Sequence, residues 1–175
     1  MFEADHPATQ AWKRGLLAAA GMADPGELTY VPVDFEREAL GDGLARAGFD
    51  PEAPAFFSWL GVVPYLTDTA IFGTLGWIAA LPGGARVVFD YGNPPAAGEA
   101  FEAGRVELAR RVEAAGEALK TCFETPTLHA RLGALGLRVL EDCGPAAMRE
   151  RLRPGTGSTG TDRGGHVLVA ASESL

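Results

Sequence analysis

The stretches FEADHPATQAWKR (residues 2–14) and LTYVPVD (residues 28–34) decide the fold. Each contains a short apolar run that ends in an acid, Asp5 in the first and Asp34 in the second. A candidate helix over residues 8–20 separates them, and two strands joined through a helix form a unit whose strands run parallel. The sequence therefore predicts a parallel sheet in which two successive strands end in a carboxylate.

The same alternation continues along the chain. Further strands are expected at 55–60, 85–89, 137–140 and 166–171, and further helices at 36–47, 67–80, 97–120, 126–135 and 146–152. Apolar residues recur at helical spacing within 67–80 and 97–120. Alternating strands and helices predict an α/β fold with a doubly wound, mostly parallel sheet. The rhythm changes near the end, so the last strand is expected to be antiparallel. We interpret residues 1–175 as a single domain.

Composition excludes several classes of protein. The chain has 175 residues, of which 47% are hydrophobic and 22% charged, so it is too apolar to be disordered. It contains no run of the ~20 apolar residues that a membrane span requires. A net charge of −8 argues against nucleic acid or anionic lipid as a partner. Two cysteines and the absence of a basic leader favour a reducing, cytoplasmic setting.

Acids at strand ends are the most informative pattern. Four predicted strands run into an acid: Asp5, Asp34, Asp90 and the pair Glu141-Asp142. Ligands of open α/β sheets bind beyond the carboxyl ends of the strands. One carboxylate there can accept hydrogen bonds from both hydroxyls of a ribose, and the next can accept a hydrogen bond from the adenine amine. The row predicts an adenosine ligand without a 2′-phosphate. The alternative is that each Asp only ends its strand and caps the next helix.

The segments FEADHPATQAWKR, YVPVDFERE (30–38), PAFFSWLGVVPYLT (54–67) and VVFDYGNPP (87–95) together resemble the bacterial branch of the leucine carboxyl methyltransferase-like family. The resemblance extends from residue 2 to about residue 171. It implies a Rossmann-like fold and S-adenosyl-L-methionine (SAM) as methyl donor. It also implies transfer of the methyl group to an oxygen, either a carboxylate or a hydroxyl, of a small molecule or a peptide.

The resemblance also implies roles for individual residues. Asp5 matches the acid that contacts the cofactor ribose, with Glu3 as an alternative or assisting ligand, and Asp34 and Phe35 match the pair that brackets the adenine. Residues 58–61 match a segment that lines the site, and Trp59 is the tryptophan most favoured to contact ligand. Many relatives have a glutamate where this chain has Leu60, which leaves the substrate open.

Relatives place a first strand and a glycine-rich loop some 20 residues before the position of Asp5, and the resemblance implies that residues 1–175 lack both. The missing strand would lie between the strand that ends at Asp5 and the one that ends near Ser58. We therefore expect exposed sheet edges, weak SAM binding, and either an oligomer or a partly molten chain. The sequence GTGSTG at 155–160 follows no strand and is interpreted as a connector.

No catalytic residue is identified from the sequence. A carboxylate acceptor needs no general base, whereas a hydroxyl acceptor does, and His6 and Asp90 are then the candidates. For His6, capping of the first helix is the alternative. His129 is expected at the surface, and the histidines share no metal-binding spacing with the cysteines. Two other functions stay open: a nicotinamide-dependent enzyme with the same fold, and an inactive relative that acts as a binding or scaffold protein.

Overall fold

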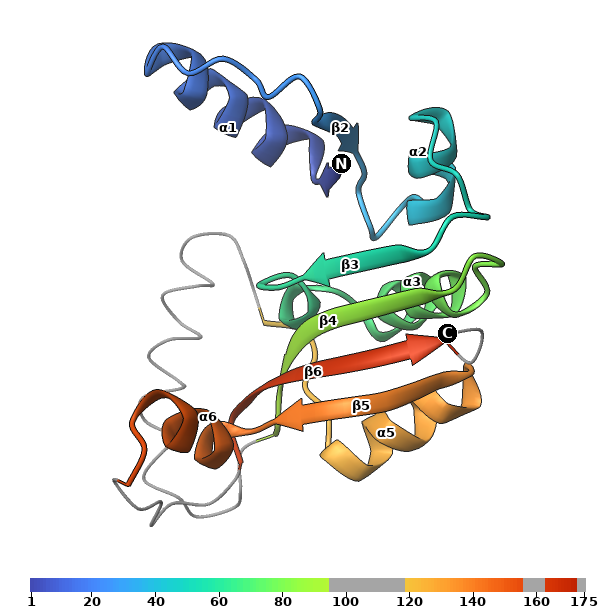
Figure 1. Ribbon diagram of the computed structural model, residues 1–175, viewed down its shortest axis with the longest axis vertical. Helices are drawn as coiled ribbons and strands as arrows, with labels where there is room; N and C mark the ends of the chain where they lie inside the picture. Colours follow the sequence, from blue (N-terminus) through green and yellow to red (C-terminus); the bar gives the residue numbers. More distant parts are fainter. Residues whose placement is uncertain (95–118, 156–162, 173–175) are drawn as a thin grey trace.

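The computed structural model describes residues 1–94, 119–155 and 163–172. Two parallel strands, β1 (Phe2–Asp5) and β2 (Thr29–Pro32), form a small sheet. Four strands form a larger sheet in the order β3-β4-β6-β5, namely β3 (Ala55–Trp59), β4 (Ala85–Gly92), β6 (Gly165–Ser172) and β5 (Leu137–Cys143). Figure 1 shows the small sheet beside β3, the edge strand of the larger one.

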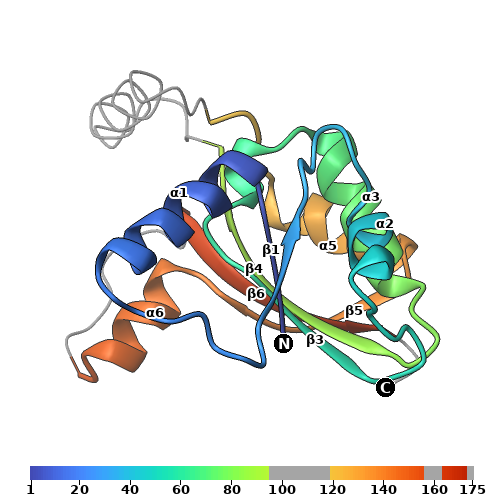
Figure 2. The same ribbon diagram turned by 90° about the horizontal axis from the view of Figure 1, so that it is seen from above.

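Helices lie on both sides of the sheets. They are α1 (Pro7–Ala19), α2 (Leu40–Arg46), α3 (Asp68–Ala79), α5 (Thr125–Ala134) and α6 (Pro145–Leu152), with a 3₁₀ turn at Val63–Tyr65. Figure 2 shows α1 and α6 on one side and α2, α3 and α5 on the other. This arrangement confirms the predicted doubly wound α/β fold. The helix expected at 97–120 lies largely outside the described residues.

The last strand is antiparallel, as predicted. β3 and β4 run parallel, whereas β6 pairs antiparallel with both β4 and β5. β6 is inserted between them and leaves β5 at the edge of the sheet. The ends of β3, β4 and β5 and the start of β6 therefore share one edge, which places His166 beside Tyr91.

Helix boundaries agree with local capping chemistry. Pro7 and Pro126 occupy first-turn positions, where the missing N–H costs nothing, and the Thr67 side chain accepts the backbone N–H of Ala70 at the start of α3. α2 is shorter than the predicted 36–47, because residues 35–38 form turns that follow the Asp34 carbonyl.

The main core lies between the large sheet and helices α3 and α5. Phe89, Ile71, Leu75, Leu128 and Leu132 are fully buried there. A second cluster of Val31, Val33, Leu40 and Leu44 supports the small sheet. Phe49 joins the two, since its ring lies 5.7 Å from Phe2 in β1 and 6.2 Å from Phe57 in β3.

No hydrogen-bonded ladder joins β1 to β3 within the described residues. An apolar cavity of about 230 Å³ lies between these strands, lined among others by Phe2, Phe56 and Trp59. The Phe56 side chain is 66% exposed. Within the described residues, β1 and β3 thus belong to separate sheets. In the part of the chain that the structure describes, no helix is long and apolar enough to cross a membrane.

Candidate functional site

A cavity of about 380 Å³ opens where β1, β2 and β3 end. Its volume falls in the range of small-molecule sites, about 300–1,000 Å³. The structure brings together here the predicted residues Asp5, Asp34 and Phe35, which come from two strands, with Ser58, Trp59 and Leu60 from a third. The full lining is Glu3, Ala4, Asp5, His6, Lys13, Val33, Asp34, Phe35, Glu36, Ser58, Trp59, Leu60, Val62 and Leu66.

Asp5 and Asp34 end at the same edge because their strands are in register. The backbone N–H of Val33 donates to the carbonyl of Asp5 at 2.9 Å, one step before Asp34. Asp5 Oδ1 accepts the backbone N–H of His6 at 2.7 Å, and Asp34 Oδ1 accepts that of Glu36 at 3.1 Å. These bonds fix one oxygen of each carboxylate.

His6 caps α1. Its Nδ1 accepts the backbone N–H of Ala8 at 3.3 Å, and its Nε2 lies 3.9 Å from Asp34 Oδ2. This geometry is the capping role that the sequence offered as the alternative to catalysis. The His6 ring also connects the end of β1 to the acid that follows β2.

Phe35 and Trp59 form an aromatic wall of the cavity. Their ring centroids are 5.6 Å apart, with the planes tilted by 34°. Trp59 is the last residue of β3 and is buried. A planar ligand group that enters here would meet aromatic surface on one side and carboxylates at the strand ends.

Glu36 is a contributor that sequence reasoning missed. Its Oε1 accepts the backbone N–H of Thr67 at 2.9 Å and the Lys120 ammonium at 2.8 Å, and its Oε2 accepts the Thr67 hydroxyl at 2.7 Å. The Lys120 and Thr67 hydrogen bonds hold the pKa of Glu36 below its ordinary value. Glu36 thereby ties the loop after β2 to the start of α3.

Charge in the cavity is mainly negative. Glu3, Asp5, Asp34 and Glu36 line it, and Lys13 is the cationic side chain among them. Lys13 Nζ donates to Glu3 Oε2 at 2.5 Å, and this bond raises the pKa of Lys13. Glu3 Oε1 is buried without a hydrogen-bond partner among the described residues. Such a lining suits ligands that present hydroxyls, amines or positive charge, and it disfavours phosphate.

Asp90 holds the turn after β3. Its Oδ1 accepts the backbone N–H of Gly61 at 2.6 Å, and Gly61 has a φ of +73°, a conformation that favours glycine. Asp90 is absent from the cavity lining. The geometry therefore supports a structural role for this acid rather than that of a general base.

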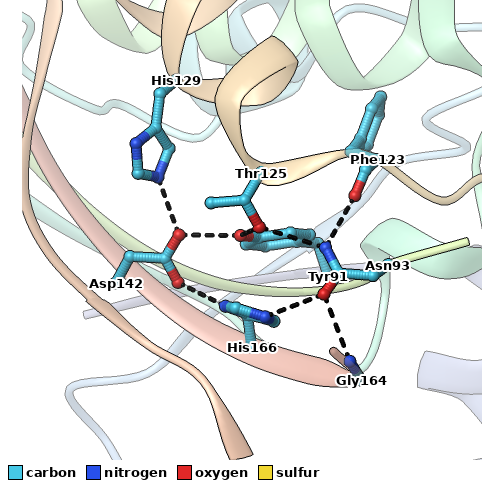
Figure 3. Close-up of polar contacts among 8 residues, drawn as sticks. All are labelled: Tyr91, Asn93, Phe123, Thr125, His129, Asp142, Gly164 and His166. Carbon is cyan, nitrogen blue, oxygen red and sulfur yellow. Dashed lines mark hydrogen bonds and ion pairs between the residues drawn. The ribbon is translucent and has the colours of Figure 1, made fainter. Parts of the chain in front are cut away.

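A second polar cluster lies at the ends of β4 and β5 (Figure 3). Asp142 is its centre: Oδ2 accepts the Tyr91 hydroxyl at 2.7 Å and lies 2.7 Å from His129 Nε2, while Oδ1 lies 2.8 Å from His166 Nδ1. The Asn93 amide donates to the Phe123 carbonyl at 2.9 Å. His129 thus contacts the sheet through Asp142, while its side chain stays 37% exposed, so it lies at the surface with one polar partner.

Histidines and acids do not form a metal centre in the described ranges: no group of three or more His, Cys, Asp or Glu side chains could hold an ion there.

Comparison with known proteins agrees with this geometry. The leucine carboxyl methyltransferase family model matches residues 1–79, the part that contains all residues lining the cavity. A Bacillus subtilis protein named "Putative S-adenosyl-L-methionine-dependent methyltransferase YktD" is 34% identical over 149 residues, which cover 83% of this chain and 48% of that protein. A similarly named protein of Saccharopolyspora erythraea is 34% identical over 91 residues, 51% of this chain and 31% of that protein.

These matches confirm the resemblance to leucine carboxyl methyltransferase-like bacterial proteins. The chain spans about half the length of YktD and a smaller share of the Saccharopolyspora erythraea protein.

Solved structures confirm the Rossmann-like fold. A DUF574 family protein from Streptomyces avermitilis has a TM-score of 0.60 at 19% identity, covering 98% of this chain and 64% of that one. PKMT2 from Rickettsia typhi also has a TM-score of 0.60, at 10% identity, covering 99% of this chain and 44% of that one.

Proposed function

We propose that this chain is a Rossmann-like domain of a SAM-dependent methyltransferase, and that its 380 Å³ cavity holds the adenosine part of SAM. One observation supports this most: Asp5 and Asp34, from adjacent strand ends, line one cavity with the Phe35 ring. In the proposed complex Asp5, assisted by Glu3, accepts the ribose hydroxyls. Asp34 accepts the adenine amine, and Phe35 packs against the base.

The lining fits this cofactor chemically. Carboxylates accept hydrogen bonds from hydroxyls and amines, and a negatively charged cavity attracts a sulfonium cation. The same carboxylates would repel the 2′-phosphate of a phosphorylated dinucleotide. SAM supplies an electrophilic methyl group, which passes to the acceptor by in-line displacement: a new oxygen–carbon bond forms as the sulfur–carbon bond breaks, and the sulfur retains the electron pair.

We further propose that the acceptor oxygen belongs to a carboxylate of a small molecule or a peptide. A carboxylate is already ionised, so the protein needs only to position it and needs no general base. The engagement of His6 with the Ala8 N–H and of Asp90 with the Gly61 N–H supports this choice over a hydroxyl. The free thiols of Cys122 and Cys143 support a cytoplasmic location.

Thermal melting with different ligands tests the function. SAM and S-adenosylhomocysteine, each at millimolar concentration, are expected to raise the melting temperature of the 175-residue chain, because a ligand that binds only the folded state stabilises it. The nicotinamide cofactors NAD and NADP are the controls and are expected to give no shift. A shift with NAD alone would instead support the nicotinamide-dependent alternative.

A binding or scaffold role is the second candidate, and it is favoured by the edges of β1 and β3 that pair with no other strand among the described residues. β1 and β3 border an apolar cavity, with Phe2 and Phe56 partly exposed at its rim. Exposed strand edges with apolar neighbours are templates for pairing with another chain. We propose that these edges mediate self-association of the 175-residue chain.

A further inference from the structure

Two buried side-chain atoms that lack a hydrogen-bond partner within the described residues belong to the lining of one cavity. They are Oε1 of Glu3 and Nε1 of Trp59. Buried polar atoms are nearly always hydrogen-bonded, because burial removes the water that would otherwise bind them. A carboxylate oxygen can only accept a hydrogen bond, and an indole N–H can only donate one. The cavity therefore contains one buried acceptor and one buried donor that a bound ligand could pair.

The surroundings of Trp59 make a chance packing defect a poor explanation. The residue is 7% exposed, its ring packs against Phe35, and it lines both the 380 Å³ cavity and the apolar cavity between β1 and β3. A phenylalanine would supply the same aromatic surface without a polar atom. The indole nitrogen is thus a donor placed where packing alone does not need one.

The cavity is short of donors for an adenosine ligand. Carboxylates such as Asp5 and Asp34 can accept hydrogen bonds from the hydroxyls and the amine of such a ligand. They cannot serve its ring nitrogens or its ribose ring oxygen, which are acceptors themselves. Lys13 already donates to Glu3. Among the side chains of the described cavity lining, the buried donor without a hydrogen-bond partner is the Trp59 N–H.

We propose that Trp59 Nε1–H donates a hydrogen bond to an acceptor atom of the nucleoside, so that Trp59 is a ligand-binding residue and selects for adenosine. This proposal rests on the proposed function, because it assumes an adenosine ligand between Phe35 and the strand-end acids. It adds a donor to a site otherwise described by its acceptors.

Indole N–H resonances provide the direct test. The chain has three tryptophans, Trp12, Trp59 and Trp77, and hence three indole signals in a nitrogen–proton correlation spectrum. The Trp59→Phe variant assigns the Trp59 signal by its disappearance. Titration with adenosine is expected to move that signal downfield, as a new hydrogen bond does, and to leave the Trp12 signal in place, since Trp12 is 67% exposed on α1 and outside the cavity lining.

Affinity and stability separate binding from structure. Trp59→Phe is expected to lower the affinity for adenosine and for S-adenosylhomocysteine by the same factor, about three- to tenfold, which is the range of one neutral hydrogen bond. It is not expected to lower the melting temperature of the free protein. Trp12→Phe is the matched control and is expected to change neither affinity.

Four results would overturn the proposal. The first is a Trp59 signal that stays fixed at saturating adenosine, and the second is an unchanged affinity of Trp59→Phe for both ligands. The third is a loss of affinity for S-adenosylhomocysteine alone, and the fourth is a loss of affinity accompanied by a lower melting temperature of the variant. If the wild-type chain binds neither ligand, the proposed function itself fails, an outcome distinct from a wild type that binds and a variant that binds equally well.

Discussion

His166 Nδ1 lies 2.8 Å from Asp142 Oδ1, and both side chains are at least nine-tenths buried. Asn93 shows which atoms carry protons. Its amide nitrogen donates to the Phe123 carbonyl and its Oδ1 accepts the Gly164 N–H, so Oδ1 must accept from His166 Nε2, 3.0 Å away. His166 therefore links the Asp142 carboxylate to Asn93 in one buried hydrogen-bond network.

Removal of the charge at Asp142 is expected to destabilise the fold strongly. Asp142→Asn leaves His166, His129 and Tyr91 facing a neutral amide, and each hydrogen bond to a charged group contributes about 1.5–3 kcal/mol. Chemical denaturation measures the loss in the free energy of unfolding. The control is Glu141→Gln at the neighbouring position, whose exposed bridge to Arg151 is expected to contribute little. Equal effects of the two substitutions would contradict the importance of the Asp142 charge.

Acidification is expected to weaken the same cluster. Burial alone would raise the pKa of Asp142, but hydrogen bonds from Tyr91, His166 and His129 outweigh it and hold that pKa below its ordinary value. A lowered pKa in the folded state stabilises the fold above the unfolded pKa, about 3.9, and this contribution is lost as the pH falls through the folded pKa. The unfolding free energy of the wild type should therefore fall more steeply below about pH 4 than that of Asp142→Asn. Parallel curves would contradict this assignment.

Asp5→Ala and Asp34→Ala are each expected to weaken binding of S-adenosylhomocysteine. Each removes a charged acceptor worth roughly 1.5–3 kcal/mol, or about ten- to a hundredfold in affinity. Titration calorimetry measures the change. Asp42→Ala on α2, an exposed acid outside the cavity lining, is the control. Variants within twofold of the wild type would remove Asp5 or Asp34 from the site.

Self-association through the separated strands predicts a concentration-dependent mass. Light scattering after size exclusion is expected to show species larger than one chain, because unpaired edge groups of β1 and β3 gain partners on association. Phe56→Lys places a charge on the exposed face of β3 and should shift the distribution toward the monomer. Phe72→Leu on α3, away from this edge, should not. A monomer at all concentrations with a sharp thermal transition would refute this prediction.

Local patterns were sufficient to predict the strands, most helices and the position of Asp5 and Asp34 at one sheet edge. Asp5 is the last residue of β1 and Asp34 lies two residues after the end of β2, so the sheet edge brings them together without any further information. Capping prolines and Thr67 set the helix starts for the same local reason. The predicted length of α2 was wrong, because the backbone N–H groups of Arg37 and Glu38 donate to the Asp34 carbonyl in turns that replace the first helical turn expected there.

Long-range contacts could not be predicted in the same way. Glu36 reaches Thr67 and Lys120, which are 31 and 84 positions away. Asp142 of β5 meets Tyr91 of β4 across β6, the strand that carries His166. The sequence placed Asp142 only among the acids at strand ends. A polar residue in an otherwise apolar strand, such as His166 before VLVAA, was the available signal.

Backbone amide shifts during titration with S-adenosylhomocysteine test the central claim most directly. The claim predicts that the largest changes occur at Asp5, Asp34 and Phe35 and at residues 58–60, the strand ends that line the cavity. Amides around Asp142 and His166 should change little. Largest changes at the Asp142 cluster, or no change at millimolar ligand, would contradict the proposed adenosine site.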